Sequence, residues 1–147
     1  MIEHPEAVTI AGQIAETLVG KRVRSALRGN TPHKWAFYSR SAEEYAAILE
    51  GQSVVGADPS GSLILVRVSS GHTLVLGGGG ERIRYHASAD TVPAKHQLLL
   101  HFDDGTFLSV KVQGWGSCRL YTPEELDGYW WYAKRSLEPT DDGFRRE

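Results

Sequence analysis

From Ser53 onwards, residues that favour turns recur about every eight to twelve positions, and short apolar or alternating segments separate them. The turn signals are Asp58-Pro59-Ser60-Gly61, Ser69-Ser70-Gly71, glycines 77–80, Asp103-Asp104-Gly105 and Gly114-Trp115-Gly116. The intervening segments include residues 63–68, 73–76, 97–102 and 107–112. This spacing is typical of an antiparallel sandwich or barrel, because each segment is long enough for one strand. Glycines 77–80 lack the helix and lysine of a phosphate loop, and we interpret them as a flexible hairpin.

The residues before Ser53 have helical patterns. Apolar side chains recur at helical spacing towards Gly20, which predicts a helix that packs across the edge of a sheet; they are Ala7, Ile10, Ala11, Ile14 and Leu18. Ser41 and Glu44 have the spacing of a capping box and predict a second helix that ends at Gly51. We therefore predict an α+β fold that is mostly β, an antiparallel β-sandwich with two flanking helices.

Composition narrows the class of protein. A length of 147 residues suits one domain with a real core. No apolar run is long enough to span a bilayer, and the N-terminus lacks the pattern of a secretory signal. The single cysteine, Cys118, rules out an internal disulfide and a structural zinc site, and it favours a cytoplasmic location. We expect Cys118 to be buried and inert, and we expect no metal and no cofactor.

Positive charge is concentrated near the N-terminus, although the net charge is −2. Residues 1–40 hold six basic and three acidic side chains, and most of the basic ones lie between positions 21 and 28. If the protein binds nucleic acid, the expected phosphate contacts are Lys21, Arg22, Arg24 and Arg28. The alternative is an ordinary solvated strand.

Carboxylates lie unusually close to the α-amine of Met1. Glu3 and Glu6 flank Pro5 where the first helix begins. They could position an amine and move protons, or they could cap the positive end of the helix.

The same stretch resembles the start of the formamidopyrimidine-DNA glycosylase and endonuclease VIII family. Glu3, Pro5, Glu6 and Thr9 match the family's opening pattern, whereas Ile2 stands where the family keeps its catalytic proline. The resemblance continues through residues 18–23, 32–35, 95–96 and 102–106. It covers residues 1–121, which we expect to form one sandwich domain, and leaves 122–147 as an aromatic extension with a frayed tail.

The resemblance implies a specific chemistry. In the family, the secondary amine of an N-terminal proline attacks C1′ of the sugar and forms a Schiff base, and the adjacent glutamate transfers protons. Here methionine is expected to be retained before the bulky Ile2, so the free amine belongs to Met1. That amine is primary and displaced by about 3.5 Å, where a misplacement of about 1 Å can cost 100-fold in rate. Lys34 is the other candidate amine beside a family motif.

Other positions that the family uses on DNA are also changed. The family's lysine aligns with Ser62, its gap-filling methionine with Gly78, and its arginine and phenylalanine with Gln113 and Trp115. Trp115 can replace the phenylalanine, because an aromatic side chain can wedge between bases. The family's helical domain and zinc finger have no counterpart in these residues.

Three hypotheses follow. The first is a DNA-binding domain related to base-excision-repair glycosylases, with weak or no catalysis, whose partner is damaged or abasic DNA. The second is an active glycosylase or abasic-site lyase that uses Met1 or Lys34, with Glu3 and Glu6 as proton-transfer groups. The third is a protein-interaction module. The aromatic cluster Tyr129–Tyr132 could be core, a homodimer interface, or a docking surface for a chain that supplies the missing domain.

Overall fold

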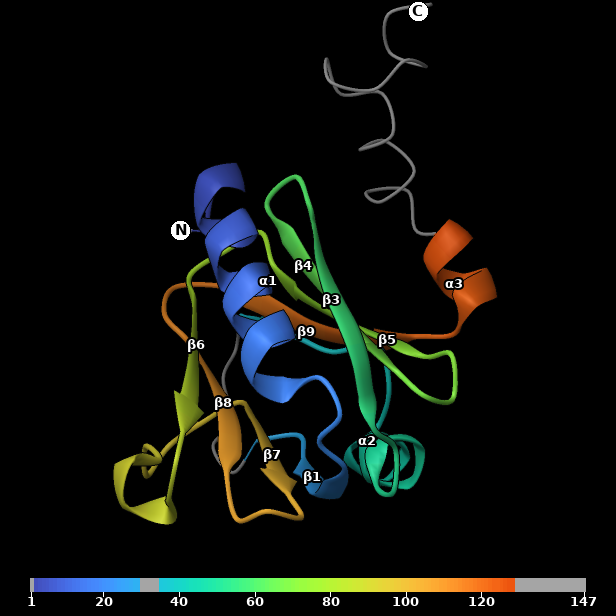
Figure 1. Cartoon of the computed structure of the whole chain (residues 1–147). Helices are drawn as coiled ribbons and strands as arrows, with labels where there is room; N and C mark the ends of the chain where they lie inside the picture. The colour runs from blue at the N-terminus through green and yellow to red at the C-terminus, as the bar shows by residue number, and fades with distance from the viewer. Residues whose placement is uncertain (1, 30–34, 129–147) are drawn as a thin grey trace, which may run out of the picture.

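The computed structural model describes residues 2–29 and 35–128, which form two β-sheets and three helices (Figure 1). The four-stranded sheet has the order β1 (Val23–Leu27), β7 (Leu98–Phe102), β8 (Phe107–Val112) and β6 (Glu81–His86). The five-stranded sheet has the order β2 (Ala36–Phe37), β9 (Gly116–Tyr121), β5 (Thr73–Gly77), β4 (Leu63–Val68) and β3 (Val54–Ser60). The helices are α1 (His4–Leu18), α2 (Ala42–Leu49) and the short α3 (Pro123–Gly128), and a 3-10 turn, η1, covers Ala89–Thr91. The predicted α+β, mostly β class is confirmed.

The prediction that the strands are antiparallel is wrong for one strand pair. The two-residue strand β2 runs parallel to β9, with Ala36 opposite Gly116 and Phe37 opposite Ser117. The other strand pairs among the described residues are antiparallel. Trp35, directly before β2, lies next to the start of β9, because its carbonyl oxygen accepts from the Gly116 N–H at 3.0 Å.

One apolar core joins both sheets to α1 and α2. It includes Leu18, Tyr45, Leu76, Phe102 and Leu120, all at most 1% exposed. Burial of such side chains contributes about 1.5–3 kcal/mol each, so this shared core is the main reason that the two sheets hold together.

Helix α1 has the apolar face that its sequence predicts. Ala7, Ala11, Ile14 and Leu18 are buried, and the helix packs against β3, the edge strand of its sheet, and β4 (Figure 1). The small alanine side chains let the helix approach the sheet closely. A hydrogen bond between His4 Nδ1 and the carbonyl oxygen of Gly61, at 2.8 Å, also ties the first turn of α1 to the β3–β4 turn.

Two turn predictions are wrong. Strand β3 continues through Asp58, Pro59 and Ser60, and the chain reverses only at Gly61. A proline is tolerated there because β3 is an edge strand, where one face of the backbone needs no ladder partner. The glycines 77–80 do not close a hairpin, because β5 and β6 belong to different sheets and the glycines carry the chain from one sheet to the other.

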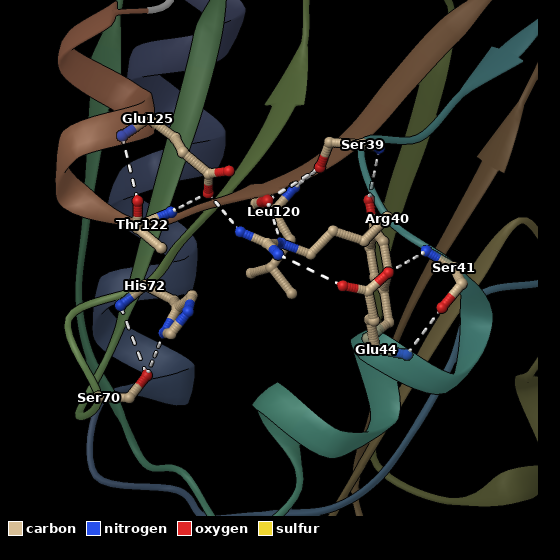
Figure 2. Close-up of polar contacts among 10 residues, drawn as sticks. Ser39, Arg40, Ser41, Glu44, Ser70, His72, Leu120, Thr122 and Glu125 are labelled. Carbon is tan, nitrogen blue, oxygen red and sulfur yellow. Dashed lines mark hydrogen bonds and ion pairs between the residues drawn. The ribbon is translucent and has the colours of Figure 1, made fainter.

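A polar network centred on Arg40 connects α2, β9 and α3 (Figure 2). The Arg40 guanidinium donates to the Leu120 carbonyl oxygen at 3.0 Å, lies 3.5 Å from a Glu44 oxygen and pairs with Glu125. Thr122 and Glu125 exchange hydrogen bonds in the manner of a capping box, which starts α3. The first turn of the C-terminal segment is thereby fastened to the rest of the fold. The cluster Tyr129–Tyr132 and the predicted frayed tail lie outside the described residues.

Candidate nucleic-acid interface

Three loops meet at the N-terminal end of α1, around the residue that replaces the family's proline. The backbone N–H of Ile2 donates to the Gly79 carbonyl oxygen at 2.7 Å, and the Ile2 side chain is only 4% exposed and belongs to the core. The next glycine, Gly80, donates to the Trp115 carbonyl oxygen at 2.7 Å and accepts from Gln113 at 2.8 Å. The start of the chain at Ile2, the glycine crossover (glycines 77–80, between β5 and β6) and the loop of residues 113–115 therefore form one hydrogen-bonded junction.

The junction needs glycine at two positions. A Cβ atom at Gly79 would lie 2.5 Å from the Trp115 carbonyl oxygen, and one at Gly80 would lie 2.0 Å from the Gln113 carbonyl oxygen. Real Cβ atoms do not approach backbone this closely, so the glycines allow the two loops to touch.

A buried carboxylate, Glu81, fastens the same junction, and sequence reasoning does not select it. Its two oxygens accept from the Gly79 N–H at 3.0 Å and from the Ser117 N–H at 2.7 Å, and the residue is 5% exposed. Burial raises the pKa of Glu81, while hydrogen bonds from backbone N–H groups counter that shift. An acid directly after a glycine run, inside an alternating strand, was the available signal.

The structure places Glu3 and Glu6 in a capping box at the start of α1. Both side chains are exposed, and the Glu3 N–H lies 3.4 Å from a Glu6 carboxylate oxygen. These contacts account for both acids as helix caps, which is one of the two roles that their position suggested. The two candidate amines, on Met1 and Lys34, lie outside the described residues.

The positions that replace the family's lysine and methionine face each other across the crossover. Gly78 donates its N–H to the Ser62 carbonyl oxygen at 3.1 Å. Trp115 lies on the neighbouring loop with its side chain 44% exposed, and Gln113 is exposed as well. The fold thus brings these sequence-predicted positions together with Ile2, and Trp115 is the large exposed side chain among them.

The basic residues predicted as phosphate contacts are largely engaged with protein groups. Lys21 pairs with Asp104, and Asp103 lies 3.5 Å from the Arg24 guanidinium and 3.9 Å from that of Arg22. The hydrogen bond from Lys21 lowers the pKa of Asp104 to about 2. The β7–β8 turn therefore supplies acidic partners for this basic row.

The fourth predicted contact, Arg28, points elsewhere. Its guanidinium donates to the Arg40 carbonyl oxygen at 2.6 Å and lies over the Tyr38 ring, 4.3 Å from the centroid. Arg28 therefore does not form one continuous, unpaired basic surface with Lys21, Arg22 and Arg24.

Cys118 is buried, as predicted. Burial raises the pKa of its thiol, so the thiolate needed for nucleophilic attack is disfavoured. Within residues 2–29 and 35–128, no group of three His, Cys, Asp or Glu side chains is arranged to hold a metal ion. None of the helices in that part of the chain has the length and apolar character needed to cross a membrane.

Solved structures of DNA glycosylases share this fold. Lactococcus lactis formamidopyrimidine-DNA glycosylase, non-covalently bound to DNA that contains an abasic site, superposes with a TM-score of 0.73 at 21% identity, covering 88% of this chain and 48% of that one. MutM in complex with DNA containing carbocyclic 8-oxo-G gives a TM-score of 0.73 at 20% identity, with 88% and 48% covered. The chain thus spans about half the length of these proteins. No curated protein matches.

The sequence model described as formamidopyrimidine-DNA glycosylase N-terminal domain matches residues 1–117. That span runs from the N-terminal junction to the start of β9 and includes the whole four-stranded sheet and the other four strands of the five-stranded one. The domain boundary at residue 121 stays a prediction. The chain belongs to the family of formamidopyrimidine-DNA glycosylase N-terminal domains.

Proposed function

We propose that this chain is a DNA-binding domain of the base-excision-repair type that performs little or no glycosylase or lyase chemistry. Family membership supports DNA as the partner, because similar structures were solved on DNA with abasic or damaged sites. The exposed Trp115 supports contact with an opened base step, since aromatic side chains can wedge between bases. The single, buried Cys118 fits the cytoplasmic location that the sequence predicts.

The burial of Ile2 carries the proposal of weak catalysis. In the family this position holds the nucleophilic amine, whereas here its nitrogen is a peptide N–H that donates to Gly79 and its side chain is packed in the core. A peptide nitrogen is not a nucleophile, and an amine moved to Met1 lies one residue away from the place where the family performs its attack. Glu3 and Glu6 have a structural role as helix caps that does not need a substrate.

Borohydride trapping on DNA with an abasic site tests the proposal directly. We expect the wild-type protein to bind the DNA in a mobility-shift assay and to give no efficient covalent adduct after reduction. Lys34→Ala serves as a matched variant, because it removes the second amine that the family resemblance proposes as a nucleophile. A strong adduct that mass spectrometry maps to the Met1 amine, or one that disappears in Lys34→Ala, would establish an active enzyme instead.

The interaction-module hypothesis makes the opposite prediction for binding. If the protein binds neither abasic DNA nor intact DNA at low salt, the DNA-binding proposal fails and a protein partner becomes the better interpretation.

A further inference from the structure

An open groove of about 150 Å³ lies on the outer face of the four-stranded sheet, over β6 and β8. Figure 1 shows these two strands side by side at the edge of that sheet. The described residues that line it are Arg82, Arg84, Pro93, Ser109, Lys111 and Gln113. Of these lining residues, only Gln113 is among the positions that the family resemblance singled out.

Strand geometry explains why the cations of the groove converge. Side chains alternate between the two faces of a strand, and in the register of β6 and β8, Arg82 lies opposite Lys111 and Arg84 opposite Ser109. The intervening residues Ile83 and Val110 lie opposite each other and pack in the core. Three cationic side chains therefore share the outer face.

This arrangement is unfavourable for the isolated fold. Like charges directly opposite each other on antiparallel strands destabilise the pair, and Arg82 and Lys111 are such a pair. None of the described residues that line the groove is acidic, and no ion pair joins Arg82, Arg84 or Lys111 to another described residue. A bound anion would relieve this repulsion.

The floor of the groove is polar and held in place. The Ser109 hydroxyl lies 2.7 Å from His86 Nε2, and His86 Nδ1 lies 2.8 Å from the Thr91 hydroxyl. Burial lowers the pKa of His86 and the charge of Arg84 lowers it further, so the ring is neutral at pH 7. Ser109, which lines the groove, is thus held from below by a neutral partner and adds no charge to the three cations.

We infer that this groove binds the phosphodiester backbone of DNA through Arg82, Arg84 and Lys111, an inference that rests on the proposed function. Arginine and lysine are the usual phosphate ligands of nucleic-acid-binding proteins. The groove is open, and it ends at Gln113, on the loop that exposes Trp115 two residues later. A strand held by its phosphates in the groove would continue past Gln113 towards Trp115, and a combination of cations and an aromatic side chain suits a polynucleotide better than an isolated phosphate ion.

Salt-dependent binding to a labelled duplex with a stable abasic-site analogue tests this inference. The groove variant combines Arg82→Gln, Arg84→Gln and Lys111→Gln, and the matched control combines Lys21→Gln, Arg22→Gln and Arg24→Gln. Each phosphate contact contributes about 0.9 to the slope of log affinity against log salt, so the affinity of the groove variant should fall about 40-fold less than that of the wild type between about 50 and 200 mM salt. The control should keep most of the wild-type slope. Arg82→Lys with Arg84→Lys, which conserves the charge, should also keep it.

The outcomes separate the inference from the proposed function. A wild type that binds no DNA overturns both. A wild type that binds DNA and a folded groove variant with the same slope overturn the inference alone, as does a control that loses the slope instead. Inorganic phosphate that displaces the DNA as effectively as an unlabelled oligonucleotide, at equal phosphate concentration, overturns the assignment to a polynucleotide backbone. Circular dichroism and thermal unfolding check that each variant folds.

Discussion

Two basic surfaces on the same four-stranded sheet have opposite electrostatic surroundings. The row at the start of β1 consists of Lys21, Arg22 and Arg24, and the groove over β6 and β8 contains Arg82, Arg84 and Lys111. The row has carboxylates from the β7–β8 turn within ion-pairing distance of every member. The groove has none among the described residues. The number of cations is equal, and only the second set is available to an external anion.

The difference shows why charge counts along a sequence are a weak guide to phosphate binding. Lys21 and Asp104 are 83 residues apart, so the pairing that neutralises the row is invisible in any local window. Conversely, Arg82 and Lys111 come together only through the register of two strands. The most basic segment of the sequence is therefore the one whose cations have acidic partners in the fold, whereas the groove cations have none among the described residues.

Removing the carboxylates of the acidic turn, Asp103 and Asp104 between β7 and β8, should produce the largest change in DNA binding. In a variant with Asp103→Asn and Asp104→Asn, three cations lose their partners and become free for phosphate contacts. We expect the variant to bind DNA more tightly than the wild type at low salt. Between about 50 and 200 mM salt, its affinity should decrease up to about 40-fold more than that of the wild type. Fluorescence anisotropy titrations at several salt concentrations measure both effects. An unchanged slope would show that the row lies away from bound DNA, whatever its pairing.

A smaller change in DNA binding should follow when a cation of the groove receives an acidic partner, as the cations of the row already have. Lys111→Glu places an acid opposite Arg82, and such a cross-strand pair should raise the free energy of unfolding by about 0.2–1 kcal/mol. DNA binding should weaken at the same time, because Lys111 and the newly paired Arg82 both lose their phosphate contacts. The affinity should then fall about tenfold less than that of the wild type between about 50 and 200 mM salt. Urea denaturation and anisotropy on the same preparation measure the two quantities. Lys111→Gln is the control, because it removes the repulsion without adding an attraction. If Lys111→Glu destabilises the protein, the two side chains do not interact as their register implies.

Local features of the fold were predictable from the sequence, whereas contacts between distant segments were not. Helical spacing and the Ser41 and Glu44 capping box place α1 and α2 correctly, because these signals act within one or two turns. The turn at Asp58-Pro59-Ser60-Gly61 was placed too early, because an edge strand accepts a proline that a central strand would not. The glycine run was assigned to a hairpin because nothing local reveals that β5 and β6 belong to different sheets.

The candidate site divides in the same way. The positions of Ile2, Gly78, Gln113 and Trp115 follow from the order of the family's motifs, and the structure brings them together. Glu81 was missed because its function as an anchor depends on backbone N–H groups from two other segments. Side chains that serve the backbone of distant loops leave little trace in a single sequence.

The smallest expected effect concerns the pairing of Lys21 with Asp104 as the pH falls. The hydrogen bond from Lys21, with smaller contributions from the hydrogen bonds of Thr106, lowers the pKa of Asp104 from its ordinary value of 3.8 to about 2. A carboxyl whose pKa is lower in the folded state stabilises the fold above the unfolded pKa, and that contribution is lost as the pH falls from about 4 towards 2. The free energy of unfolding of the wild type should therefore decrease more steeply across this window than that of Asp104→Asn, as measured by urea denaturation at each pH. The difference should shrink at high salt, because the pair is exposed and salt screens it.

Asp127→Asn is the control, since Asp127 is an exposed acid of α3 for which no ion pair is found among the described residues. Parallel curves for the wild type and Asp104→Asn would mean that the acidic turn does not hold the basic row in solution, and the contrast between the two surfaces would lose its electrostatic basis.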